Sequence, residues 1–278
     1  GLVAALDLAF LPALAFTLAR PILRAKQLHN YPFPLLLLAL TLANALVHLE
    51  MLGWAATARP GLHLAAYVVV TMIVVMGGRV IPSFTDNKLR TRARRWSAVE
   101  RPLHLATVAA LVSALIAPVS GVTALLAALA AALHAVRLAG WYTGKFWAVP
   151  LLWVLHLGYA WVALGFALLA LAAAGWGAAA GGALHAFTAG AIGTLTLGMM
   201  ARVALGHSGR MLEPARWMTP AFIAINLAAL ARVATPLLPV PYLAGMNVAG
   251  FAWVAAFGVF VAIYAPILLR PRVDGKPG

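Results

Sequence analysis

The chain has 278 residues, of which 64% are hydrophobic and only 9% are charged. An average soluble domain is about 25% charged, so this composition excludes an ordinary soluble globular protein, whose surface needs more polar side chains. It indicates an all-α polytopic membrane protein, built as a bundle of transmembrane helices. Because the chain contains no cysteine, disulfides, thiolate ligands and iron–sulfur clusters are excluded as well.

Long apolar runs divide the chain into nine predicted transmembrane helices. A bilayer core needs roughly 20 mostly apolar residues per helix, and Pro and Gly residues mark most joints between the runs. The predicted spans are 2–19, 34–57, 61–81, 102–119, 122–140, 149–174, 182–205, 218–238 and 244–269. We therefore expect a single transmembrane domain over residues 1–278, with a basic cytoplasmic loop at 83–101 as its largest loop.

The net charge of +14 is distributed unevenly between the two sides of the predicted bundle. Eighteen of the 20 Lys and Arg residues lie around the ends of the odd-numbered spans, and only Arg59 and Arg232 fall elsewhere. By the positive-inside rule, this split predicts that the chain starts outside and that its C-terminus lies in the cytoplasm. The charge is thus explained by topology and anionic lipid, so we expect the lipid bilayer, and not nucleic acid, as its partner.

Reporter fusions test this topology. Fusions at positions 28, 92 and 275 should report a cytoplasmic location, because basic loops stay on that side. Fusions near positions 120 and 240 should report the opposite side, and the reverse pattern would contradict the predicted orientation.

Histidines inside the predicted spans are the main candidates for chemistry. An ionisable side chain in a span is costly and often functional, although a hydrogen bond to a neighbouring helix explains any single one equally well. At 1.5 Å per residue, His134 and His156 lie about 9–10 Å from the cytoplasmic face on consecutive helices, so we expect them to approach one another. Toward the outer face, His48 lies about 13 Å deep, whereas His63 and His185 lie at roughly 3–5 Å. Imidazole is the usual side chain for ligation of haem iron and suits copper.

Other polar residues give weaker indications. Glu50 lies two residues from His48, which puts the two side chains on different sides of a helix. Glu50 is either a relay or pairing group, for example with Arg232, or a carboxylate at the water interface. Two methionine pairs are more typical of packing than of copper binding: Met72 with Met76, and Met199 with Met200.

Three stretches go beyond what hydrophobic composition produces. They are MGGRVIPSFTDNKL (76–89), RLAGWYTGKFWAVPLLWVLHLGYAWVALG (137–165) and HAFTAGAIGTLTLGMMARVALGHSGR (185–210). Together with the ALDLAF opening and the ANALVHL of the second span, they resemble the NnrS family of bacterial membrane proteins, and the third stretch is the most specific. The resemblance runs along nearly the whole chain.

The resemblance implies a haem- and copper-containing protein of the bacterial inner membrane that is associated with denitrification and nitric oxide resistance. Family members are generally longer. We therefore expect this chain to be roughly the C-terminal three-quarters of a longer protein and to lack the family's N-terminal spans, which include a helix with His and Glu.

The matching positions imply candidate ligands for these cofactors. The candidate haem and metal ligands are the membrane histidines His48, His134, His156 and His185. His207, near the end of the most specific stretch, is a further metal candidate. Arg79 and Arg202 would bind haem propionates through charge-assisted hydrogen bonds, or would anchor lipid headgroups. On the outer side we expect His48 to act with His185, and we prefer His48 to His63 because its greater depth shields haem from water.

The leading functional hypothesis is a haem- and copper-binding membrane protein of nitric oxide stress, with nitric oxide or a redox protein as partner. One alternative is an enzyme that processes nitric oxide at a haem–copper pair, which needs a histidine cluster around the second metal. Another is a transporter of a small anion or metal, which needs an inverted repeat with broken helices. A Soret band in the purified protein favours the first two, and its absence favours the transporter.

Overall fold

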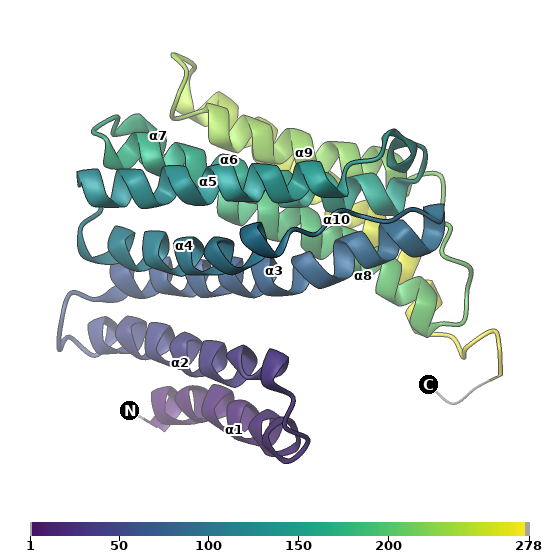
Figure 1. Ribbon diagram of the computed structural model, residues 1–278, viewed down its shortest axis with the longest axis horizontal. Helices are drawn as coiled ribbons and strands as arrows, with labels where there is room; N and C mark the ends of the chain where they lie inside the picture. Colours follow the sequence, from purple (N-terminus) through teal and green to yellow (C-terminus); the bar gives the residue numbers. More distant parts are fainter. Residues whose placement is uncertain (1, 276–278) are drawn as a thin grey trace. The chain divides into compact units, whose positions relative to one another are not determined.

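The computed structural model describes residues 2–275, and every described element is a helix. In chain order (Figure 1) these are α1 (Leu2–Arg24), η1 (Leu28–Asn30), α2 (Pro32–Met51), α3 (Ala58–Leu89), α4 (Ser97–Ile116), α5 (Gly121–Trp141), η2 (Gly144–Ala148), α6 (Pro150–Ala173), α7 (Ala178–His185), η3 (Ala186–Ile192), α8 (Gly193–His207), α9 (Met218–Ala234) and α10 (Tyr242–Leu268). The predicted all-α fold is confirmed. Lys276, which contributed to the charge pattern, lies outside the described residues.

The helices match the predicted spans one for one. Eight helical segments of the described chain are long and apolar enough to cross a membrane, and α7, η3 and α8 together form one of them. The ninth, α9, has 17 residues. At 1.5 Å per residue it is about 26 Å long, which is near the lower limit for crossing the hydrocarbon core. The chain is therefore an integral membrane protein.

The connection between α3 and α4 differs from the expected loop at 83–101. Helix α3 continues past Pro82 to Leu89, and α4 begins at Ser97, before the expected start at residue 102. Only residues 90–96 between them are non-helical. The Asp86 carboxylate accepts a hydrogen bond from the Ala93 N–H at 2.8 Å. A short turn, closed by a side chain of α3 itself, thus replaces the long loop that Pro82 suggested.

The chain divides into two units, residues 2–74 and 75–275, which are described separately. In the first unit, α1 packs against α2, and polar groups join α2 to the start of α3. The Thr57 hydroxyl donates to the Leu46 carbonyl at 2.6 Å, and the Glu50 carboxylate accepts from the Ala58 N–H at 2.7 Å. Glu50 thus satisfies a backbone donor at the start of α3. The expectation of one transmembrane domain over the whole chain stays a prediction.

Helix α6 is the central helix of the second unit. It packs against α5, α7, η3, α8 and α9, and it is apolar on all sides, as a buried helix is expected to be. Two glycines allow the close approach of its neighbours. A Cβ atom at Gly158 would lie 2.6 Å from the Leu195 side chain, and one at Gly190 would lie 2.6 Å from the Trp161 ring. Small residues at such contacts let membrane helices pack closely.

Candidate functional site

A chain of hydrogen bonds crosses α4, α5 and α6 inside the second unit. The buried Arg137 donates through Nε and Nη2 to the Glu100 carboxylate, at 2.9 and 2.5 Å, and through Nη1 to the Tyr159 hydroxyl at 2.8 Å. The Tyr159 hydroxyl lies 2.8 Å from Nδ1 of His134. Nε2 of His134 lies 3.0 Å from the Thr107 hydroxyl. The network therefore links an ion pair to a fully buried imidazole.

The partners of His134 determine which of its nitrogens carries the proton. The Thr107 hydroxyl donates to the Leu103 carbonyl at 2.7 Å, so it accepts from the His134 Nε2–H. Nδ1 then carries the lone pair and accepts from the Tyr159 hydroxyl. The ring also stacks on Phe166, with centroids 5.2 Å apart. Because both nitrogens are bonded within the protein, metal ligation by His134 would break one of these bonds.

His156 is buried on α6 with one ring nitrogen unused. Nδ1 lies 3.0 Å from the Leu152 carbonyl and donates to it, and the ring stacks on Phe146 of η2 at a centroid distance of 4.1 Å. Nε2 is buried and makes no hydrogen bond. The Trp141 backbone lies within reach, but its carbonyl and the neutral Nε2 are both acceptors. One nitrogen fixed by a carbonyl and the other left with its lone pair is the arrangement of a metal-binding histidine.

The predicted approach of His134 and His156 is not seen as a direct contact. Between these two described residues there is no hydrogen bond and no ring contact; His134 contacts Tyr159 and Phe166, and His156 contacts Phe146. Their sharing of one iron therefore stays a prediction.

His48, in the first unit, is oriented by a carboxylate from the neighbouring helix. Its Nε2 donates to Asp7 of α1 at 2.9 Å, and Asn44 donates to the same oxygen at 2.6 Å. A carboxylate that holds an imidazole in this way is a common partner of a metal-bound histidine. The rival His63 instead donates through Nδ1 to the Arg59 carbonyl at 2.8 Å. His185 belongs to the other unit, so its pairing with His48 stays a prediction.

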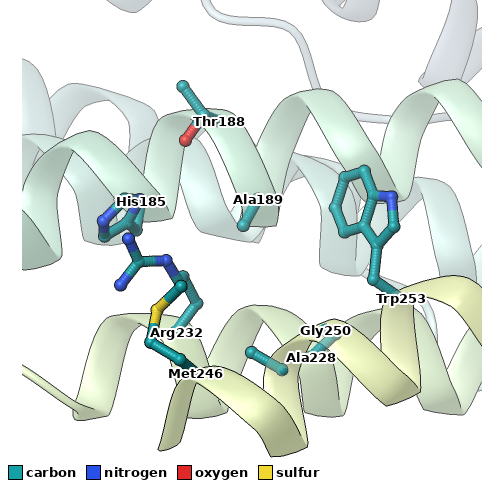
Figure 2. Close-up of a pocket in the computed structure, with 9 residues that line it drawn as sticks. His185, Thr188, Ala189, Ala228, Arg232, Met246, Gly250 and Trp253 are labelled. Carbon is teal, nitrogen blue, oxygen red and sulfur yellow. The ribbon is translucent and has the colours of Figure 1, made fainter. Parts of the chain in front are cut away.

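His185 lines a cavity of about 340 Å³ in the second unit (Figure 2). The lining residues come from α7, η3, α9 and α10: His185, Thr188, Ala189, Ala228, Arg232, Met246, Ala249, Gly250 and Trp253. Figure 2 shows the Arg232 guanidinium turned toward the His185 ring, with the Met246 sulfur beside it. The π-helix η3 starts directly after His185, and π-helical turns are rare and occur often at functional sites.

The predicted propionate partners lie in the second unit. Arg202 is half-buried, and its guanidinium carbon lies 3.7 Å from the centre of the Phe84 ring, a cation–π contact between α8 and α3. Arg79 is half-buried on α3. Their binding of haem propionates stays a prediction.

The side chain of His207 is exposed at the end of α8. Its carbonyl accepts a hydrogen bond from Arg272 at 2.8 Å. Arg272 also donates to the Asp274 carboxylate at 2.6 Å, and this bond raises the pKa of the guanidinium. A metal role for the imidazole stays a prediction.

Several residues of these sites were missed in the sequence. Arg137 was counted only as a basic residue that marks the cytoplasmic end of a span, whereas the structure buries it against Glu100. The usable signal was spacing, because Arg137 lies three residues from His134, which places both on one helix face. The partnership of Asp7 with His48, and that of Arg232 and Met246 with His185, join distant parts of the chain, and local spacing carries no signal for them.

The comparisons with known proteins identify the family of the chain. The model of a family described as NnrS protein matches residues 1–272, nearly the whole chain. No curated protein and no solved structure matches it. The stretches that carried the resemblance lie inside the matched range, and the chain belongs to the NnrS family.

Proposed function

We propose that this chain is a haem-binding protein of the bacterial inner membrane, with its C-terminus in the cytoplasm, that acts in resistance to nitric oxide and in denitrification. Membership of the NnrS family supports a role in the nitric oxide response, and the helices support an integral membrane protein. The observation that carries the haem assignment is the buried, unused Nε2 of His156.

The hydrogen bonding of the His156 ring fits an axial ligand of haem iron. Such a ligand needs a neutral ring with a lone pair on the nitrogen that faces the metal. The Leu152 carbonyl holds the proton on Nδ1, and Phe146 covers one face of the ring. When bound, haem supplies an iron that binds nitric oxide or exchanges an electron. The chain itself contributes the orientation and the protonation state of the imidazole.

Copper has weaker support from the arrangement of side chains. Across residues 2–275, no three His, Cys, Asp or Glu side chains are grouped so that they could hold one metal ion. The copper assignment therefore rests on the resemblance, and its candidate ligands remain the predicted histidines His48, His134, His156, His185 and His207. The alternative of a haem–copper enzyme needs such a cluster, so we do not extend the proposal to catalysis.

Replacing His156 by leucine tests the haem assignment. Leucine fills the space but offers no lone pair. It removes the unpartnered Nε2 together with the Nδ1–H donor, and the Leu152 carbonyl keeps its backbone hydrogen bond within α6, so we expect only a small effect on the fold. We expect the wild-type chain, purified from membranes grown with haem precursor, to show a Soret band, and His156→Leu to lose it. Bound haem would itself stabilise the wild type, so the thermal midpoint is compared between haem-free proteins in detergent, where the two should be similar. Cells expressing the variant should lose their growth advantage under a nitric oxide donor.

His63→Leu is the matched control. His63 shares the bond from Nδ1 to the carbonyl four residues earlier, but its ring is only half-buried. We expect this variant to keep the Soret band. A Soret band that survives in His156→Leu would contradict the assignment of His156. A wild-type protein without the band would contradict haem binding and favour the transporter.

A further inference from the structure

The cavity beside His185 combines one cationic side chain with mostly apolar walls. Six of its lining residues are apolar or glycine: Ala189, Ala228, Met246, Ala249, Gly250 and Trp253. The three polar ones are His185, Thr188 and Arg232. Thr188 already donates its hydroxyl to the Leu184 carbonyl at 2.9 Å. The guanidinium of Arg232 is therefore the chief charged group that a ligand would meet.

The Arg232 side chain carries the positive charge of this lining. Among the described residues, no carboxylate forms an ion pair with it; the ion pairs are those of His48, Arg137 and Arg272. Its aromatic neighbour is Tyr242, whose ring centre lies 6.0 Å away, at the outer limit of a cation–π contact. The carbonyls at the end of α9 supply only partial negative charge. A guanidinium inside a membrane helix normally has a partner, so the site favours an anion.

The lining residues lie at different depths from one end of the second unit. Arg232 is two residues from the end of α9, about 3 Å along the axis, and Met246 is four residues from the start of α10, about 6 Å. Trp253 is eleven residues from that start, about 16 Å. The charged side chain of the lining therefore lies near the helix ends, and the apolar side chains continue deeper along the helices. A free inorganic ion would gain nothing from the deeper part.

The same charge disfavours a bare metal cation. A copper ion held between His185 and the Met246 sulfur would sit beside the guanidinium in Figure 2, and like charges at a few ångströms repel strongly in a medium of low dielectric constant. A ligand with a negative head and an apolar body satisfies the guanidinium and also fills the space between η3 and α10.

We propose that this cavity binds one amphiphile whose carboxylate or phosphate pairs with Arg232 and whose apolar body lies against Met246 and Trp253. The ligand is a fatty acid or an anionic phospholipid, which share this chemistry. Bound there, it would contact α9, α10 and the π-helix that follows His185. The proposal is independent of the haem assignment, which rests on His156.

Binding of oleate and of dioleoylphosphatidylglycerol to the full chain in a non-ionic detergent tests this proposal. Oleyl alcohol and dioleoylglycerol are the uncharged comparators with the same chains. We expect saturable binding of at least one anionic ligand, and the one that binds shows whether the natural ligand is a fatty acid or a phospholipid. Its uncharged comparator should bind at least about tenfold more weakly, because a charged hydrogen bond is lost. Binding should change the fluorescence of the wild-type protein, and this change should shrink in Trp253→Phe.

Variants at two arginines show whether the ligand binds at Arg232 or is attracted by the overall positive charge of the protein. Arg232→Gln should weaken the anionic ligand about tenfold or more, and Arg232→Lys should retain most of the affinity. Arg216→Gln is the matched control, because Arg216 also lies over an aromatic ring, that of Trp217 at 5.4 Å, but is exposed. Equal affinity for charged and uncharged ligands, or an unchanged affinity in Arg232→Gln, would overturn the proposal. So would loss of the Soret band in Arg232→Gln without any amphiphile binding by the wild type, which would assign the guanidinium to haem.

Discussion

Glu100→Ala is expected to cost the protein about 3 kcal/mol of folding free energy, the low end of the range of about 3–5 kcal/mol for breaking a buried ion pair. The substitution leaves the Arg137 guanidinium, 3% exposed, without its carboxylate. The low end applies because the Glu100 side chain is itself 28% exposed, so water can reach part of the site. The measurement is a thermal or SDS unfolding curve of the purified chain in detergent.

Two further variants show whether the loss comes from the pair. Glu213→Ala removes an exposed carboxylate after α8 and should leave the midpoint within experimental error. The double variant Glu100→Ala/Arg137→Leu removes both charges, so it should recover much of the loss. If the double variant is no more stable than Glu100→Ala alone, the loss does not come from the unpaired Arg137 charge.

Gly190→Ala is the second change with a large expected effect. The new Cβ atom would lie 2.6 Å from the Trp161 ring, and that ring cannot move freely because its Nε1–H donates to Asn226 at 2.9 Å. Overpacking of this kind costs about 1–3 kcal/mol. We expect a lower thermal midpoint and less folded protein in the membrane.

The matched control for this substitution is Gly258→Ala on α10. No atom lies within 4 Å of the position where its Cβ would be, so the change should be neutral, or stabilising by up to about 1 kcal/mol from helix propensity. Equal midpoints for the two alanine variants would show that the contact between Gly190 and Trp161 relaxes without cost.

The sequence predicts the helices of this protein well because the signal for a membrane span is local. Long apolar runs and their breaks gave nine segments, each with a helical counterpart. Boundaries were less accurate where Pro82 suggested an end. A proline removes one N–H from a helix, but neighbouring groups can compensate, so α3 continues to Leu89. Whether a membrane helix ends at a proline or continues past it depends on the groups that surround the proline in the folded protein.

The candidate sites were predictable only in part. Depth along a helix follows from counting residues, so the histidines could be placed as membrane residues. The use of each ring nitrogen depends on contacts between distant segments. His134 and His156 looked alike in the sequence, yet one is bonded through both nitrogens and the other retains a lone pair.

The π-helix η3 changes which residues share a face along the span Ala178–His207. A π turn takes up an additional residue relative to an α turn, and each residue of an α-helix advances the chain by about 100° around the axis. The parts of the span before Ala186 and after Ile192 therefore follow two helical wheels that are out of phase. A single wheel drawn through all thirty residues would assign Arg202 to the wrong azimuth relative to His185. A homologue with one residue fewer here and an uninterrupted α-helix would keep the flanking residues in nearly the same arrangement, because the π turn accommodates the additional residue.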